Sequence, residues 1–188
     1  MIPPEEAARA NFYALLARLF YAPPDAGLLR AIAAETMAGD LAGPWSDLAK
    51  AAAGADPETV REEFETVFIG TGKAPVTLYT SAYTIRYSSE VPLAELRGEL
   101  ARLGLARRRD AGEPEDHIAA LCDTMRHLIA EQKMELEEQR RFFNRWIAPA
   151  AERLCAAIDT NANTCFYRSV GRFAKAFLTL EQAAFEML

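Results

Sequence analysis

The sequence predicts an all-α protein, and three observations lead to this prediction. Apolar residues recur at the i, i+3, i+4 spacing of one helical face in nearly every readable segment. Proline and glycine interrupt these runs where helices would start and stop. Repeated short alternating strands do not occur in the sequence. The chain of 188 residues is long enough for one sizeable core, so we expect a single helical-bundle domain over residues 1–188.

The expected helices have recognisable start and stop signals. Asp56-Pro57-Glu58 provides an N-cap, a proline at the first helical position and an acidic first turn. Gly70 closes the helix that follows, and Gly104 is placed to cap the C-terminus of another. In chain order, we expect helices over residues 12–20, 28 to about 39, 45–53, 57–69, 92–103, 114–139, 142–158 and 166–188.

The run from Pro114 to about Gln139 is predicted to be the longest helix, and Pro149 should bend its helix or mark the effective start of it. Residues 70–79 have no periodicity and are expected to form a loop. Residues 81–87 carry aromatic and β-branched side chains that suit a strand as well as a helix, so both assignments stay open.

Charge and composition limit the classes of partner. The formal net charge of −6 argues against nucleic-acid binding and favours a cationic peptide. The N-terminal residues have neither a basic start nor an apolar run, and no stretch approaches the roughly 18 apolar residues of a membrane span. We therefore expect a cytoplasmic protein without stable membrane insertion. Cys122 and Cys155 are expected to pack as small hydrophobic residues.

The most informative motif is Glu-Pro-Glu-Asp-His at residues 113–117. Proline favours the first helical turn, so we expect a loop-to-helix junction near residues 105–117. Acidic first turns are routine helix-start chemistry, and this is the simpler interpretation of the motif. On a helical wheel, His117 falls at the edge of the buried face and Asp116 near the opposite side. The two side chains are therefore not expected to point inward together.

Other kinds of site find little support in the sequence. The chain has two histidines and no Glu-x-x-His motif, which argues against a metal centre. No serine lies in a Gly-x-Ser-x-Gly context, and the loop from Gly70 to Lys73 lacks phosphate-binding spacing. Arg107, Arg108 and Arg109 most simply solvate a loop, although they leave weak guanine-nucleotide binding open. No cofactor is expected.

Aromatic side chains gather around the expected loop at residues 70–79. They are Phe64, Phe68, Tyr79, Tyr83 and Tyr87. These rings could pack in the core, or they could line an apolar cleft with tyrosine hydroxyls at its rim, suited to a peptide. The sequence leaves both interpretations open.

Four motifs in order resemble one known family. They are a helix end with Phe64, Val67, Phe68 and Gly70, a Ser-x-Tyr segment with Ser81 and Tyr83, Glu-Pro-x-Asp-His with Glu113, Pro114, Asp116 and His117, and a stretch from Phe142 to Pro149. The combination is similar to the TorD/DmsD/NarJ family of redox-enzyme maturation chaperones, closest to the TorD-like branch. The resemblance covers nearly the whole chain.

This resemblance implies an all-helical cytoplasmic chaperone that catalyses no reaction. Such a protein binds an apo molybdopterin oxidoreductase, often through its twin-arginine signal peptide, until the cofactor is inserted, and so prevents premature export. The peptide-binding residues that it implies are Phe64, Val67, Phe68, Tyr79, Ser81, Tyr83, Glu113, Pro114, Asp116 and His117.

Two alternatives of other classes remain at this stage. One is a small nucleotide-binding or nucleotide-hydrolysing helical protein that uses the loop at residues 107–109 together with Asp116. The other is a helical scaffold without a signal-peptide role. The sequence leaves the cognate oxidoreductase open, and it does not distinguish a monomer from a dimer.

Overall fold

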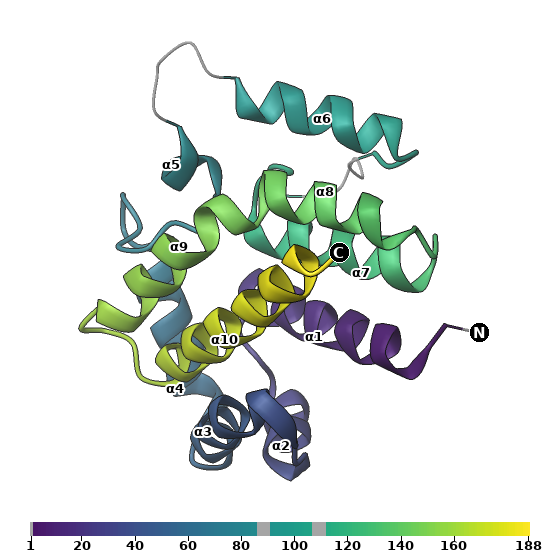
Figure 1. The fold of residues 1–188 in the computed structure, drawn as a ribbon. Coiled ribbons are helices and arrows are strands. Elements are labelled where there is room, and N and C mark those ends of the chain that lie inside the picture. The colour runs from purple at the N-terminus through teal and green to yellow at the C-terminus, as the bar shows by residue number, and fades with distance from the viewer. Residues whose placement is uncertain (1, 86–90, 107–111) are drawn as a thin grey trace. The chain divides into compact units, whose positions relative to one another are not determined.

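The computed structural model describes residues 2–85, 91–106 and 112–188, and in this part of the chain helices are joined by loops (Figure 1). The elements are α1 (Pro4–Tyr21), α2 (Ala26–Ala34), the 3₁₀ turn η1 (Gly39–Leu41), α3 (Ala42–Ala53), α4 (Pro57–Phe64), the π-helical turn η2 (Glu65–Ile69), α5 (Ser81–Thr84), α6 (Pro92–Arg102), α7 (Ile118–Ala130), α8 (Leu136–Trp146), α9 (Ala148–Thr160) and α10 (Phe166–Glu186). The only β-type pairing among the described residues is an isolated bridge between Tyr79 and His117. The predicted all-α class is confirmed.

The chain divides into two compact units, each built from two separate stretches. Unit 1 contains Met1–Ala17 and Leu78–Ala150, and unit 2 contains Arg18–Thr77 and Ala151–Leu188. Helices α1 and α9 therefore contribute residues to both units. The expectation of a single domain stays a prediction. None of the described helices is long and apolar enough to span a bilayer.

Unit 2 contains α2, α3, α4 and α10, with α3 lying against both α2 and α10. The Trp45 and Phe173 rings meet edge-on, with their centroids 5.3 Å apart. The Trp45 indole N–H donates a hydrogen bond to the Glu35 carbonyl at 2.9 Å. The start signal of α4 acts as the sequence indicates, because Asp56 accepts a hydrogen bond from the Thr59 N–H at 2.9 Å. Local chemistry thus sets the N-terminus of α4.

A carboxylate on α4 also caps α10 within unit 2. Glu63 accepts hydrogen bonds from the backbone N–H groups of Cys165, Phe166 and Tyr167 at 2.8–3.0 Å. These donors have no carbonyl partner within their own helix, and the negative charge matches the positive end of the helix dipole. This contact joins residues about a hundred positions apart, so no local sequence signal predicts it.

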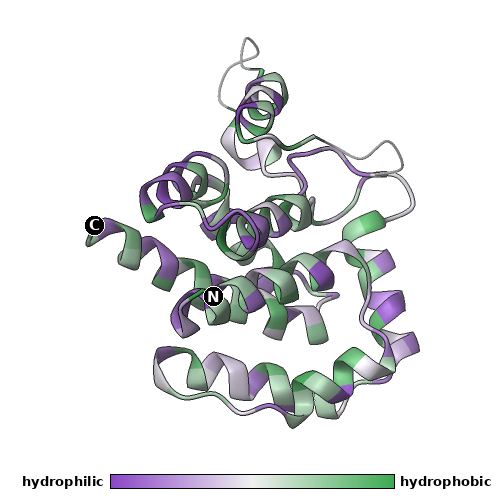
Figure 2. Ribbon diagram, turned by 90° about the vertical axis from the view of Figure 1, so that its right-hand side faces the viewer, coloured by the Kyte–Doolittle hydropathy of each residue, from purple (hydrophilic) through white to green (hydrophobic). Residues whose placement is uncertain are grey.

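Unit 1 contains α6, α7 and α8. Both apolar and polar residues occur along the helices of the protein (Figure 2). The stripe predicted for α7 is buried, including Leu121, Met125 and Leu128. Phe142 and Phe143 of α8 are also buried. The apolar periodicity therefore identified the inward faces of both helices correctly.

The predicted helix over residues 114–139 is wrong in its boundaries. Its first turn does not form, and α7 begins at Ile118 with His117 as its N-cap. The helix ends at Ala130, where Glu131 and Gln132 both donate backbone hydrogen bonds to the His127 carbonyl. Lys133 then adopts a positive φ of 51°, which turns the chain before α8 begins. Among the described residues, the longest helix is α10, with 21 residues.

Proline and glycine mark the other boundaries largely as expected. Pro149 lies in the first turn of α9, after α8 has ended at Trp146, so it marks the effective start of a helix. Gly70 ends η2 with φ 65° and donates its N–H to the Glu65 carbonyl at 2.7 Å. A Cβ atom there would also lie 3.1 Å from the Lys73 carbonyl oxygen, which explains why glycine suits this turn.

Candidate functional site

The Glu-Pro-Glu-Asp-His motif and the segment around Ser81 come together in unit 1. Two backbone hydrogen bonds join them: Ile118 donates to the Leu78 carbonyl at 2.8 Å, and Thr80 donates to the Asp116 carbonyl at 2.9 Å. Tyr79 and His117 form the isolated antiparallel bridge between these bonds. The backbone pairing therefore aligns two segments that the sequence separates by about 35 residues.

Side chains strengthen the same junction. Ser81 Oγ donates to Asp116 Oδ2 at 2.5 Å, and the Tyr79 hydroxyl donates to a carboxylate oxygen of Glu113. The hydrogen bond to Glu113, with burial as a second cause, raises the pKa of Tyr79 to about 12. The phenol is therefore protonated at neutral pH and acts as the donor in this pair.

The histidine of the motif is a buried helix cap. His117 Nδ1 accepts a hydrogen bond from the Ala119 N–H at 3.2 Å, and its ring meets Tyr79 edge-on at 5.4 Å. Burial lowers the pKa of His117, while the nearby carboxylates of Glu113 and Asp116 act in the opposite direction. The neutral imidazole is the form that can accept the capping hydrogen bond.

The prediction that Asp116 and His117 do not both point inward was wrong. Asp116 and His117 are both buried, with 7% and 6% of their surfaces exposed. The wheel assumed that residues 114–117 form a regular helical turn, whereas these residues precede α7 and are held by the Leu78–Ser81 segment. Extended backbone at His117 places the two neighbours differently from a helix, so both can be covered.

Glu115 belongs to the same motif but was not predicted to be a site residue. Glu115 accepts two hydrogen bonds from the Arg97 guanidinium of α6, Nε to Oε1 at 3.0 Å and Nη2 to Oε2 at 3.1 Å. Only 10% of the Glu115 side chain is exposed. A third carboxylate within the motif was the sequence signal that could have indicated a role for Glu115. Its partner Arg97 lies on another helix and could not be identified from residue spacing.

The predicted aromatic residues of η2 and the end of α4 lie in the core of unit 2. Phe64, Val67 and Phe68 are 6%, 0% and 8% exposed. The rings of Phe64 and Phe68 meet edge-on, with their centroids 5.2 Å apart. The centroid of the Tyr167 ring lies 5.0–5.5 Å from both. For these residues the core-packing interpretation describes the structure, because an open ring-lined surface requires exposed rings.

The remaining predicted peptide-binding residues belong to unit 1. Tyr79, Ser81 and Tyr83 are partly exposed, Pro114 is also partly exposed, and Glu113 is exposed. Residues 81–84 form the single helical turn α5, which resolves the helix-or-strand ambiguity for that part of the segment. Unit 1 therefore presents a partly aromatic surface with an accessible carboxylate.

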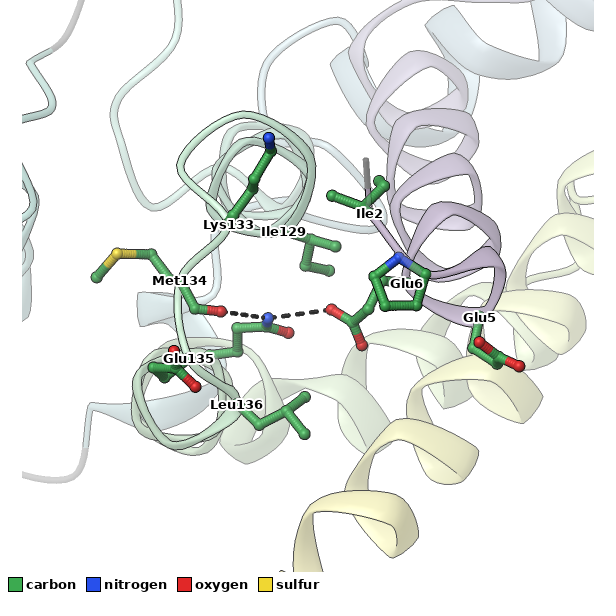
Figure 3. Close-up of a pocket in the computed structure, with 10 residues that line it drawn as sticks. Ile2, Glu5, Glu6, Ile129, Lys133, Met134, Glu135 and Leu136 are labelled. Atoms are coloured by element: carbon green, nitrogen blue, oxygen red, sulfur yellow. Dashed lines mark hydrogen bonds between the residues drawn. The ribbon is translucent and has the colours of Figure 1, made fainter.

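A cavity of about 500 Å³ lies elsewhere in unit 1 (Figure 3). Ile2, Ile129 and Leu136 supply much of its apolar lining, and Glu5 and Glu135 stand among its charged residues. Beside it, the Gln139 amide donates to the Met134 carbonyl and to Glu6, and its oxygen accepts from Arg9. None of the peptide-binding residues predicted from the sequence lines this cavity.

Several other sequence predictions can now be placed. Cys122 and Cys155 are buried, as expected. The arginines at 107–109 and Tyr87 lie outside the described residues, so the nucleotide hypothesis that depends on this loop gains no structural description. Within the described ranges, no group of three or more histidine, cysteine, aspartate or glutamate residues could hold a metal ion.

Comparison with known proteins identifies the class to which this fold belongs. A family profile described as the nitrate reductase delta subunit matches residues 34–156. The chain therefore belongs to this family, and the predicted relationship to the TorD and NarJ proteins is confirmed.

Two individual relatives define the extent of the similarity. The chaperone protein TorD of Photobacterium profundum is 29% identical over 136 residues, covering 64% of this chain and 61% of that protein, so less than two thirds of the relative is matched. A crystal structure of a candidate redox enzyme maturation protein from Archaeoglobus fulgidus has a TM-score of 0.60 at 18% identity, covering 91% of this chain and 93% of the other. The second comparison shows a shared fold.

Proposed function

We propose that this protein is a chaperone that binds the twin-arginine signal peptide of an apo molybdopterin oxidoreductase in the cytoplasm, and that it catalyses no reaction. Binding would hold the client until its cofactor is inserted and so prevent premature export. Membership of the family and the similarity to a chaperone named TorD support this class of function. The observation that carries the peptide-binding proposal is the junction in unit 1, where the exposed Glu113 is hydrogen-bonded to the partly exposed Tyr79.

The chemistry of this surface fits a peptide with a cationic head and an apolar segment. Glu113 can receive an arginine through charge-assisted hydrogen bonds, each contributing roughly 1.5–3 kcal/mol where well formed. The faces of Tyr79 and Tyr83 can cover apolar side chains at about 25 cal/mol per Å² removed from water. Ordering a flexible peptide offsets part of this gain. We therefore expect an affinity on the order of micromolar, weak enough for release.

The residues of the junction divide into two roles under this proposal. Glu113, Tyr79 and Tyr83 are accessible enough to touch the peptide. Asp116 and His117 are buried, and they position the surface through the Ser81 hydrogen bond and the α7 cap. The buried side chains of Phe64, Val67 and Phe68 would support the fold of unit 2. Truncating a buried phenylalanine costs about 3–5 kcal/mol, so Phe64→Ala would not separate binding from folding.

The variant Glu113→Gln tests the proposal with little structural disturbance. Glutamine retains an acceptor for the Tyr79 hydroxyl but removes the negative charge. We expect it to weaken binding of a synthetic peptide with adjacent arginines and an apolar segment by about three- to tenfold at low salt. The loss should shrink at high salt, because screening weakens exposed charge pairs. Isothermal titration at two ionic strengths measures both effects.

Glu137→Gln provides the matched control. It removes an exposed carboxylate from α8 of the same unit and changes the net charge of the chain by the same amount. Its effect on peptide affinity should be small. Equal losses in the two variants would mean that general attraction, rather than a site at Glu113, governs binding.

A further inference from the structure

The mostly covered carboxylate of Glu115 already binds a guanidinium. Arg97 approaches it with two parallel N–H donors, the bidentate geometry that arginine and carboxylate groups favour. The Arg97 side chain is about half exposed, whereas that of Glu115 is mostly covered. The acceptor is thus fixed in place, and the arginine reaches it from the solvent side.

The surroundings of this pair suit any arginine, not only Arg97. The hydrogen bonds that Arg97 donates to Glu115 raise the pKa of Arg97, and the charges of Glu115 and Asp116 act in the same direction. Two neighbouring carboxylates therefore favour a positive charge at this position. Glu113, which presents an accessible carboxylate, lies two residues before Glu115 in the same motif.

The helix that carries Arg97 is attached to unit 1 mainly by exposed ion pairs and a few buried leucines. Glu95 pairs with Arg145 at 3.0 Å, and Arg102 pairs with Glu138 at 2.9 Å. The buried side chains of α6 are Leu96 and Leu100, with Leu103 just beyond its end. The Arg97 side chain is about half exposed, so another guanidinium can approach Glu115 from solvent and exchange with it.

We propose that Glu115 is an arginine-binding residue for a client peptide and that Arg97 is its internal competitor. The inference rests on the proposed peptide-binding function and adds a regulatory contact to the same site. A client arginine must displace Arg97 before it can take the same two acceptor atoms. Only molecules in which Arg97 has left Glu115 can bind the arginine. The apparent dissociation constant is therefore the intrinsic constant divided by the fraction of such molecules.

Removing the competitor should strengthen binding. For the same adjacent-arginine peptide, we expect Arg97→Ala to lower the dissociation constant by about two- to fivefold, the range that one exposed ion pair would give. Glu115→Gln should weaken binding. In the Glu115→Gln background, the gain from Arg97→Ala should disappear, because the contested acceptor is no longer charged. This double-mutant cycle isolates the competition.

Arg102→Ala is the control for a general loosening of α6. Arg102 lies on the same helix and also forms exposed ion pairs, but with Glu99 and Glu138 rather than Glu115. It should leave the affinity unchanged. An equal gain from Arg102→Ala, or unchanged or weaker binding by Arg97→Ala, would overturn the competition.

Failure of the underlying function would look different. If neither the wild-type protein nor Arg97→Ala binds the peptide, the peptide-binding proposal fails together with this inference. If the wild-type protein binds and the Arg97 series shows no gain, only the competitor role of Arg97 is lost. Circular dichroism confirms that each variant is folded before its affinity is compared.

Discussion

His117 is the last residue of the junction loop, and its imidazole caps the N-terminus of α7. Its neutral Nδ1 accepts the Ala119 N–H, and burial opposes its protonation more strongly than Glu113 and Asp116 favour it. Protonation would remove the acceptor and place a charge in a covered position. His117 therefore makes the stability of the junction depend on pH.

The sign of this dependence follows from the lowered pKa. Below the usual histidine pKa of about 6.5, the unfolded chain takes up a proton that folded His117 resists, so stability falls as the pH drops. We expect the wild-type free energy of unfolding to decrease by at most about 1.4 kcal/mol per pH unit from this group below pH 6.5. Urea denaturation at pH values on both sides of 6.5 measures the loss.

The variant His117→Asn separates this titration from the cap. Asparagine is a strong N-cap but has no titrating group in this range. The variant should therefore lose less stability than the wild-type protein on acidification, while its stability at pH 7.5 stays similar. Identical pH profiles would show that other groups cause the acid sensitivity.

The sequence predicted that the motif lies near a helix start, but it did not predict which residues its side chains contact. The spacing of residues 113–117 predicted a helix start at Pro114 from local proline chemistry, whereas α7 begins four residues later, at Ile118. The partner of Glu115 is an arginine on α6, and Ser81 reaches Asp116 across about 35 residues. Such pairs depend on how distant segments meet, which single-sequence periodicity does not encode.

At the scale of elements, local signals were reliable where they acted alone. The N-cap of α4 and the turn at Gly70 follow from Asp56, Pro57 and glycine chemistry. The break between α7 and α8 was missed, because the left-handed turn occurs at Lys133, a residue without a typical turn signal. The turn is supported by the Met134 N–H, which donates to the Leu128 carbonyl at 2.9 Å.

Close packing between α9 and α10 in unit 2 yields a prediction at the same scale. A Cβ atom on Gly171 would lie 2.8 Å from Ile158 Cγ2, too close for an ordinary contact. Alanine improves helix propensity by up to about 1 kcal/mol, but overpacking costs about 1–3 kcal/mol. We therefore expect Gly171→Ala to lower the free energy of unfolding by roughly 1–2 kcal/mol in chemical denaturation.

Gly98→Ala in α6 is a control with the opposite expected sign. A Cβ atom there would meet nothing within 4 Å, so helix propensity acts without a clash. This variant should be more stable by about 0.5–1 kcal/mol. If Gly171→Ala stabilises the protein, the predicted clash with Ile158 does not exist. If adding Ile158→Ala reduces the stability loss caused by Gly171→Ala, the clash lies at Ile158.

At the scale of the whole molecule, the sequence predicted the helical class because apolar periodicity runs through most of the chain. It could not assign the aromatic residues to core or surface. Phe64 and Phe68 share the residue types and spacing of a binding surface, yet they pack against Tyr167 from a distant helix. It also gave no indication of two compact units, since each is assembled from stretches far apart in the sequence.

The net charge of −6 affects how fast a cationic peptide can bind. An excess of negative charge attracts such a peptide before contact, and salt screens this attraction over a Debye length of about 10 Å at 0.1 M. We expect the association rate constant for the adjacent-arginine peptide to fall about three- to tenfold between low and high salt. The dissociation rate should change less, because steering acts before the complex forms.

Stopped-flow fluorescence can measure both rates, and a peptide with glutamines in place of the arginines is the control. Its association should be nearly independent of salt, because it lacks the charges on which the field acts. If the two peptides show the same salt dependence, attraction by the acidic chain is not what accelerates binding. If salt acts on dissociation alone, short-range ion pairs such as those at Glu113 and Glu115 dominate, and the distributed charge of the molecule contributes little.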